Sequence, residues 1–273
     1  MYSGTTLKGS RHFDAWFGAH QKIDRVARQH LAELIPEDTD KFPTSRKITR
    51  FEGIDGPDGI KRKNPGGEEP WHFYDPSGTD NERILTDVHT HYDGLVAALR
   101  NGDDTRSAFE AAWLAHAIVD GLTPAHHYPY EAELAKLRGT GRETRTSVKE
   151  QFLLPGATLP KRLRNNWQMW GDKGLLATHF TFEWGVTIAA MPLRLRKGIV
   201  SEVNIAYGGK HGVEALFKQQ AEQIAKLNMY EEFYRSGWTP KLVKQVRREL
   251  LPAIVNCVTV VWLLAVREAV ACE

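Results

Sequence analysis

The chain has 273 residues, of which 41% are hydrophobic, and a formal net charge of +2. This length and composition suffice for a substantial core, in one large domain or two small ones. Because the net charge is nearly balanced, it does not by itself indicate binding to nucleic acid or to an anionic membrane. Any such binding must come from local patches of charge. The two cysteines, Cys257 and Cys272, lie too far apart along one expected helix to pair, so no disulfide framework is predicted.

Apolar residues recur every three or four positions through most of the chain, which is the periodicity of amphipathic helices. No segment alternates in the manner of a β-strand. We therefore predict an all-α fold, a single multi-helix bundle spanning residues 1–273 with long loop insertions. The expected helices cover residues 20–35, 87–102, 107–122, 174–191, 208–234 and 240–270.

Local signals indicate where these helices end. Gly102 and the two residues after it end one helix, with Ser107 as the expected cap of the next, and Gly121 and Pro124 end that next helix. Residues 51–79 are rich in Gly, Pro and Asp and are not expected to form regular helix.

A second interruption, about 131–175, is predicted to be a surface insertion or lid. Its positive face is either solvated or in contact with an anionic substrate. The basic residues that define it are Arg138, Arg142, Arg145, Lys149, Lys161, Arg162 and Arg164.

The C-terminal segment 251–266, LPAIVNCVTVVWLLAV, is the strongest candidate for a membrane span. It is shorter than the roughly 20 apolar residues that a span requires, it contains Asn256, and Arg267 and Glu268 follow directly. We predict a buried core helix and no transmembrane segment. Because the first fifteen residues lack the apolar run of a secretory signal, the chain as it stands is expected to be cytoplasmic, or secreted if a leader was removed.

Histidines and carboxylates recur at the spacing of metal ligands. His116 and Asp120 form one pair four residues apart, His179 and Glu183 form another, and His126 follows the first pair. Side chains four apart share one helix face. A single pair of this kind is more often a surface or capping pair, but a buried Asp120 within AAWLAHAIVDGL requires a compensating cation. Imidazole and carboxylate without thiolate suit Zn²⁺ or a similar divalent ion in hydrolytic chemistry.

Other chemistry-bearing residues are predicted to lie outside this site. His89 and His91 are two residues apart and face different sides of a helix, so with Asp93 they are expected to face solvent or to lie behind the ligands. Motifs of serine hydrolases, phosphate-binding loops and H-E-x-x-H metalloproteases are absent from the sequence. The tryptophans are expected mostly in the core; these are Trp113, Trp167, Trp170, Trp184 and Trp262.

The same motifs, together with HFYDP at residues 72–76 and His20 in an early helix, resemble the zinc-dependent phospholipase C and single-strand-specific nuclease superfamily. HFYDP is similar to the phospholipase C branch. The resemblance rests on the order of the motifs as well as their content, and it runs from about His20 to the C-terminal helix. It implies a cluster of two or three zinc ions at one end of a helical bundle.

The resemblance implies a ligand set, residue by residue. The eight ligands would be Asp58, His72, His116 and Asp120 for one ion, His126, His179 and Glu183 for a second, and His20 with a bridging Asp120 for a third. Asp58 would also act as general base, with Asp55 as the alternative loop aspartate.

One feature departs from the family pattern. Enzymes of this family commonly begin with a tryptophan whose amino nitrogen and carbonyl oxygen chelate the third zinc. This chain begins Met1-Tyr2-Ser3, and its first tryptophan is Trp16. The sequence therefore leaves two alternatives, a third ion held with the help of His12 or a site of two ions, which would still support hydrolysis.

These observations predict a phospholipase C-like hydrolase that uses a metal-activated water to cleave a phospholipid headgroup ester, with peripheral membrane contact. A single-strand nuclease or nucleotidase acting through the same site is the first alternative, because the basic insertion would serve either substrate. A non-catalytic, metal-stabilised binding or structural protein is the second, since a fold and a site do not guarantee activity.

Overall fold

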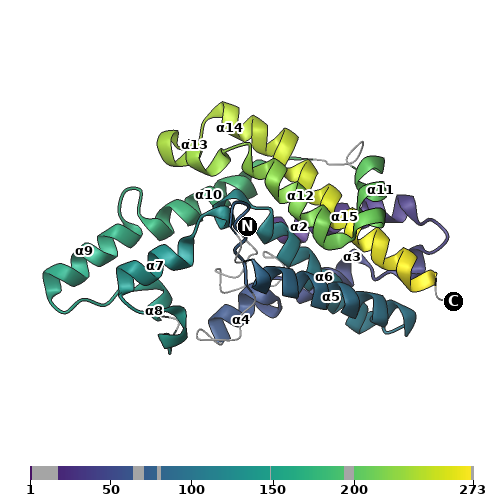
Figure 1. Ribbon diagram of the computed structural model, residues 1–273, viewed down its shortest axis with the longest axis horizontal. Helices are drawn as coiled ribbons and strands as arrows, with labels where there is room; N and C mark the ends of the chain where they lie inside the picture. The colour runs from purple at the N-terminus through teal and green to yellow at the C-terminus, as the bar shows by residue number, and fades with distance from the viewer. Residues whose placement is uncertain (2–17, 64–70, 79–80, 148, 194–199, 272–273) are drawn as a thin grey trace.

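The computed structural model describes residue 1 and residues 18–63, 71–78, 81–147, 149–193 and 200–271 (Figure 1). Within these ranges the chain is helical and has no β-strand, which confirms the predicted all-α fold. The helices are α2 (Ala19–Leu34), α3 (Ser45–Ile48), α4 (Pro57–Lys63), α5 (Glu82–Arg100), α6 (Asp104–Gly121), α7 (Tyr130–Arg138), α8 (Lys149–Phe152), α9 (Leu159–Trp170), α10 (Leu175–Ala190), α11 (Glu202–His211), α12 (Val213–Ala225), α13 (Met229–Ser236), α14 (Pro240–Gln245) and α15 (Leu251–Val270).

Helix α15 is the centre of the core and packs against α2, α5, α6, α11 and α12. Its side chains are buried at nearly every position, and Trp262 is fully buried. The indole Nε1 of Trp262 donates a hydrogen bond to the carbonyl of Ala111 on α6 at 3.2 Å. Residues 240–270 are long and apolar enough to cross a membrane by length and composition, but 83% of their most apolar window is buried inside the protein.

The predicted helices differ from the observed ones mainly at their ends. Asp103, and not Ser107, caps α6, because its side chain accepts a hydrogen bond from the Arg106 amide at 2.9 Å. The helix expected over 208–234 is interrupted at Gly212 and Asn228, whose φ angles are 87° and 50°. A π-helical turn at Val246–Leu250 joins α14 to α15, just before Pro252, which lacks a backbone N–H for the helical ladder.

Residues 130–176 form an arm, made of α7, α8, α9 and the start of α10, at the left of Figure 1. The arm has a small core of its own, formed by Tyr130, Leu134, Leu154, Met169 and Leu176. The segment predicted to be a surface insertion or lid therefore contains three helices, α7, α8 and α9, that were not predicted from the sequence. Helix α9 is started by the Thr158 side chain, which accepts a hydrogen bond from the Lys161 amide, and by Pro160 in its first turn.

Two further expectations need correction. Within residues 51–79 the structure has short helices, including α4, where the abundance of Gly and Pro predicted none. Trp262 is in the core as expected, but Trp167, Trp170 and Trp184 expose 69%, 43% and 45% of their surface. Helical periodicity shows that a residue lies on a helix face, but not whether another element covers that face. His12, Trp16 and Cys272 lie outside the described residues.

Candidate metal centre

The two predicted ligand pairs are presented by α6 and α10. His116 and Asp120 lie one turn apart near the end of α6, and both are 2% exposed. Helix α6 ends at Gly121, where a Cβ atom would come within 2.5 Å of the Phe217 ring on α12. This close packing fixes the end of α6 and therefore its ligand pair. On α10, the Nε2 atom of His179 lies 3.2 Å from Oε1 of Glu183 one turn later.

His126 and His72 lie on two segments that a backbone hydrogen bond joins. His126 is in a 3₁₀ turn, Pro124–His127, directly after α6. The amide of Tyr74 donates to the His126 carbonyl at 3.1 Å, which ties residues 71–75 to this turn. His72 Nδ1 then lies 2.5 Å from Oδ2 of Asp120. HFYDP thus contributes both a side chain and the backbone contact that positions it.

Asp58 is in the first turn of α4, and its Oδ1 is 3.9 Å from Nε2 of His116. The approach depends on Gly59, whose missing Cβ would lie 2.0 Å from the carbonyl oxygen of Ile54. Asp55, the alternative loop aspartate, is exposed. The structure therefore brings Asp58, and not Asp55, to the histidines.

All eight residues of the predicted ligand set meet at one end of α6. Their ligand atoms form three groups, each within 4.8 Å, and each group could hold a metal ion; two of the groups share His116. Asp120 contacts all three groups. Its Oδ2 faces His72 and His116, and its Oδ1 lies 3.2 Å from Nε2 of His20 and 3.6 Å from Nδ1 of His126. The groups are Asp58, His72 and His116; His126, His179 and Glu183; and His20, His116 and Asp120.

The main chain of Met1 also reaches this site. Its amino nitrogen is 2.7 Å from Oδ1 of Asp120 and 3.3 Å from Oε1 of Glu183, and its carbonyl oxygen is 2.9 Å from Nε2 of His20. The nitrogen and oxygen of residue 1 thus lie beside the group that contains His20 and Asp120. The family resemblance implies main-chain ligation by a tryptophan as first residue. Because this chain begins with Met1, the sequence left only His12 or a site of two ions as alternatives.

Glu52 is the functional side chain that the sequence did not reveal. It is buried, and its Oε2 lies 3.2 Å from Nδ1 of His116. A carboxylate on one ring nitrogen orients a histidine and leaves the other nitrogen for a metal ion. The Nε2 atom of His116 accordingly points to the carboxylates of Asp58 and Asp120 and has no hydrogen-bond partner. No residue spacing predicts the role of Glu52, because Glu52 and His116 are 64 positions apart in the chain.

The pKa values of the buried carboxylates in this site depend on the charged groups beside them. Burial raises the pKa of Asp120, but the Met1 amino group and the histidines His126 and His116 hold it well below its usual range. The pKa of Glu183 is also held well below its usual range, against burial, by the Met1 amino group and His179. Burial lowers the pKa of His126. A concentration of buried carboxylates of this kind is stable only with positive charge beside it.

The donor set fits a divalent metal ion. It consists of imidazole nitrogens and carboxylate oxygens without a thiolate, which suits the borderline and harder divalent cations. The Nδ1 atoms of His126 and His179 have no hydrogen-bond partner, while their Nε2 atoms converge on Oε1 of Glu183 at 2.7 and 3.2 Å. The two rings are stacked with centroids 5.0 Å apart, so that both present the same edge to Glu183.

His89, His91 and His127 are among the described histidines that lie outside the groups. His91 Nδ1 and His89 Nε2 each lie 2.6 Å from a carboxylate, Glu110 and Glu214 respectively. His127 donates from Nε2 to the carbonyl of Gly121 at 2.9 Å, and burial lowers its pKa to about 4. These histidines are therefore engaged in structural contacts.

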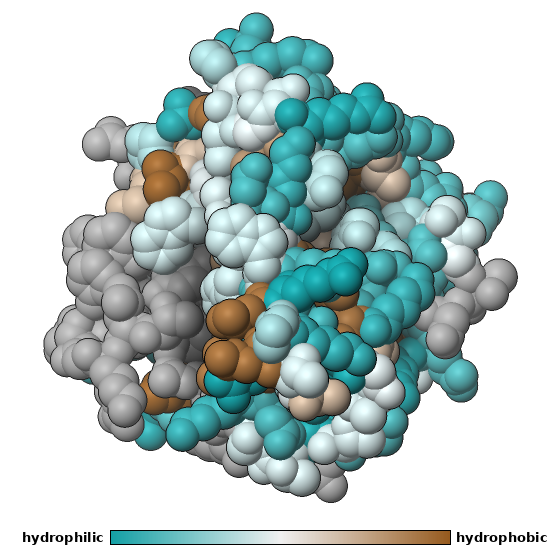
Figure 2. Space-filling model, turned by 90° about the vertical axis from the view of Figure 1, so that its left-hand side faces the viewer, coloured by the Kyte–Doolittle hydropathy of each residue, from teal (hydrophilic) through white to brown (hydrophobic). Residues whose placement is uncertain are grey.

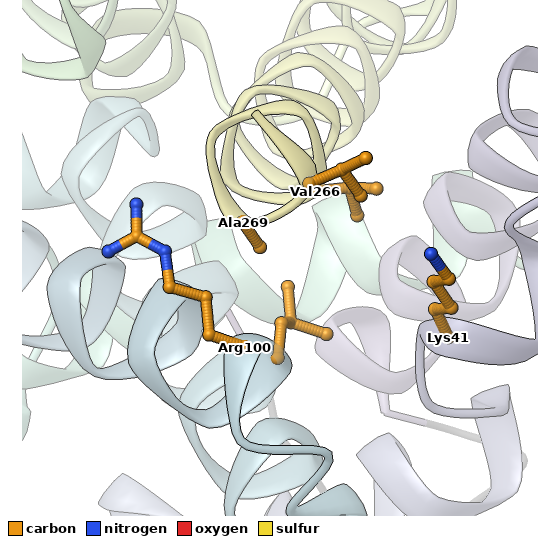
Figure 3. Close-up of a pocket in the computed structure, with 6 residues that line it drawn as sticks. Lys41, Arg100, Val266 and Ala269 are labelled. Atoms are coloured by element: carbon orange, nitrogen blue, oxygen red, sulfur yellow. The ribbon is translucent and has the colours of Figure 1, made fainter. Parts of the chain in front are cut away.

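A small cavity between α5 and α15 contributes nothing to this chemistry (Figure 3). Its walls are mainly apolar, and its charged side chains are cationic. It lies near the C-terminal end of α5, whereas the ligand pair of α6 is at the opposite end of the α5–α6 hairpin. The lining residues are Lys41, Leu99, Arg100, Val266, Ala269 and Val270.

No family model, curated protein or solved structure matches the chain. What the structure itself provides is a helical bundle with groups of buried His, Asp and Glu that could hold metal ions.

Proposed function

We propose that the protein is a zinc-dependent phosphodiester hydrolase of the phospholipase C type. The observation that carries this proposal is the convergence of the other seven expected ligand residues around Asp120, from segments between His20 and Glu183. Surface or capping pairs would not bring α2, α4, α6 and α10 to a common point. The resemblance in motif order supports zinc and phosphodiester hydrolysis in particular.

The ligand residues would hold two or three Zn²⁺ ions in the groups described above. Such ions lower the pKa of a bound water towards neutrality and bind the non-bridging oxygens of a phosphate. Asp58 is the most open carboxylate of the site, with 16% of its side chain exposed against 3% for Asp120. It is therefore placed to accept the proton of the attacking water, while the more enclosed Asp120 would serve as a ligand only.

Aromatic side chains form one wall beside the second group. Phe73 and Tyr130 are stacked, with ring centroids 5.6 Å apart and an interplanar angle of 3°, and Tyr130 lies 5.2 Å from the His179 ring. This wall limits water at that side of the site. It also offers an apolar surface to the part of a substrate that lies beyond its phosphate, which favours a phospholipid.

The third ion would use Met1 in a chain that starts at this residue. The Met1 nitrogen and carbonyl oxygen, His20 and Asp120 lie close enough to act together. Zinc content should therefore be one ion higher for a chain that starts at Met1 than for the same chain preceded by Gly-Ser. Equal content in both forms would exclude the amino nitrogen as a ligand.

The proposal is tested by zinc analysis combined with three substrates: a soluble short-chain phosphatidylcholine, single-stranded DNA and single-stranded RNA. We expect two or three zinc ions per chain and release of choline phosphate. Asp58→Asn should lower this activity by about 10²- to 10⁴-fold, the range for loss of a general base. His211→Ala, at an exposed histidine of α11, is the matched control and should change neither quantity.

The other outcomes identify the alternatives. Release of nucleotides without choline phosphate would replace the phospholipase by a nuclease on the same site. Full zinc content, a melting temperature that rises with zinc and no cleavage of any phosphodiester would indicate a metal-stabilised binding or structural protein. Protein that refuses zinc would overturn the proposal altogether.

A further inference from the structure

Helix α9 of the arm carries an apolar stripe on its solvent side. Leu159, Leu163 and Trp167 follow one another at four-residue spacing, so they lie on one helix face. They expose 59%, 62% and 69% of their surface, and Leu153, just before α9, exposes 59%. We call these four residues the α9 surface. Adjacent large side chains at this exposure are uncommon on a soluble protein unless they contact something else.

The orientation of α9 is fixed by its opposite side. Met169 is fully buried in the core of the arm. The Asn166 side chain bridges the backbone of Leu154, accepting from its amide at 3.0 Å and donating to its carbonyl at 2.9 Å. Trp170 donates from Nε1 to the carbonyl of Phe152 at 2.6 Å. Since these contacts hold α9 in place, the apolar stripe cannot turn inward.

The charges around the stripe have one sign. Lys161, Arg162 and Arg164 are exposed on α9, and this helix contains no acidic residue. None of the ion pairs found between described residues uses these three cations, whereas Arg138 and Arg145 elsewhere in the arm pair with Glu150 and Glu131. The α9 surface therefore combines unneutralised positive charge with exposed leucine and tryptophan. Figure 2 views this side of the molecule, where hydrophobic and hydrophilic residues lie side by side.

We propose that the α9 surface docks onto a membrane that contains anionic lipids. An interfacial helix buries leucine and tryptophan at the level of the headgroups while its lysines and arginines contact anionic lipid. Single-stranded nucleic acid would also be attracted by the cations and could stack on Trp167. Three of the four residues of the α9 surface are leucines, which offer no ring for stacking, so the side chains favour lipid.

Helix α9 is packed against the elements that carry the second ligand group. Helix α10 follows α9 after a short turn and carries His179 and Glu183. Met169 of α9 shares its buried cluster with Tyr130, whose ring contacts His179. The membrane-binding surface and the second ligand group are thus connected by packed elements. The docking itself does not depend on hydrolysis.

The experiment measures co-sedimentation of the zinc-loaded protein with vesicles of phosphatidylcholine and phosphatidylglycerol in equal amounts, and with phosphatidylcholine alone. We expect tighter binding to the anionic vesicles. Leu159→Ser with Leu163→Ser should weaken it by about tenfold or more, because two buried apolar side chains are lost from the interface. The triple variant K161Q, R162Q, R164Q should weaken binding to anionic vesicles by about tenfold or more and abolish the preference for them.

Val203→Ser is the matched control, since Val203 is 75% exposed on α11, outside the arm. It should leave vesicle binding unchanged, and circular dichroism and zinc content should be the same for all variants. Vesicles with brominated acyl chains should quench tryptophan fluorescence of the wild type and quench Trp167→Phe less. This measurement tests the site of contact even if a serine variant folds poorly.

The proposal is overturned if the leucine variant binds vesicles as well as the wild type, or if wild-type protein binds neither vesicle. Binding of oligothymidylate through Lys161, Arg162 and Arg164, without vesicle binding, would assign the surface to nucleic acid instead. Hydrolysis is scored separately on the soluble short-chain lipid. Vesicle binding without any hydrolysis would therefore support docking while contradicting the proposed enzymatic function.

Discussion

The bundle core and the arm differ in which side chains are placed unusually: the core buries carboxylates, and the arm exposes large apolar side chains. At the end of α6 the core buries Asp120 and Glu52, which are among the residue types least often buried. The arm instead exposes Leu163 and Trp167, which are ordinarily covered. Buried carboxylates require cations, and an exposed apolar stripe favours an apolar partner. These features are the basis for proposing a separate partner for each region, metal ions for the end of α6 and a membrane for the arm.

The largest effect is expected from removing a ligand that two groups share. His116 belongs to two of the three groups, whereas His179 belongs to one. His116→Ala should therefore cost two zinc ions and His179→Ala one, as measured by elemental analysis. The proposed zinc ions would bind the folded state only, so their loss at concentrations about 1,000 times Kd should also remove about 4 kcal/mol of stability per site. Equal losses in the two variants would show that the groups are not coupled through His116.

The core and the arm can next be compared with a single residue type. Trp262 is fully buried and Trp167 is 69% exposed. Trp262→Ala should lower the free energy of unfolding by about 3 to 5 kcal/mol, because it leaves a cavity and removes the hydrogen bond to Ala111. Trp167→Ala should change it by less than about 0.5 kcal/mol. Urea denaturation of both variants measures the difference, and a large loss at Trp167 would mean that α9 contributes to the core.

A smaller effect, on zinc affinity, is expected from changing Glu52, the carboxylate that contacts the ligand His116. Glu52→Gln should weaken zinc binding by about 10- to 100-fold, since partners of this kind orient and polarise a ligating histidine. Competition with a chelator of known affinity measures the change. Glu110→Gln is a matched control, because Glu110 is also buried and also lies against a histidine Nδ1, that of His91, outside the ligand groups. Similar affinity losses in both variants would indicate general destabilisation.

Sequence spacing predicted those features that lie within a single helix. The pairs His116–Asp120 and His179–Glu183 follow from helical spacing alone, and the helices that carry them were predicted to within a few residues. The loop ligands Asp58 and His72 entered through a family resemblance, because no spacing relates them to α6. Their approach depends on the missing Cβ of Gly59 and on a backbone bond to His126, which are tertiary features.

The remaining differences have the same physical origin. Glu52 and Met1 reach the site across 64 and 119 positions of the chain, respectively, so no window of sequence contains both partners. The sequence of α9 has a Thr158 cap and contains both basic and apolar residues, but its apolar stripe is exposed because no described element of the arm covers it. Periodicity identifies a face, and only the packed fold decides whether that face is inside or outside.

The smallest change in stability is expected at Asp24, a buried carboxyl group near the ligands. Asp24 on α2 is fully buried, and neither of its carboxylate oxygens has a hydrogen-bond partner. Burial, and then the nearby Glu52, raise its pKa well above 3.8. The folded protein therefore holds this proton more tightly than the unfolded chain does. The stability that this contributes is fully present below about pH 4 and is lost as the pH rises through the raised pKa.

Asp24→Asn does not titrate, so its advantage over the wild type should grow with pH. We expect a gain of about 1 kcal/mol in the free energy of unfolding at pH 8 and a smaller gain at pH 5, measured at a fixed zinc concentration. Asp93→Asn, at an exposed position of α5, should show no such trend. A loss of stability in Asp24→Asn at both pH values would mean that the core needs a charged carboxylate at Asp24, and that its tolerance for negative charge extends beyond the ligands themselves.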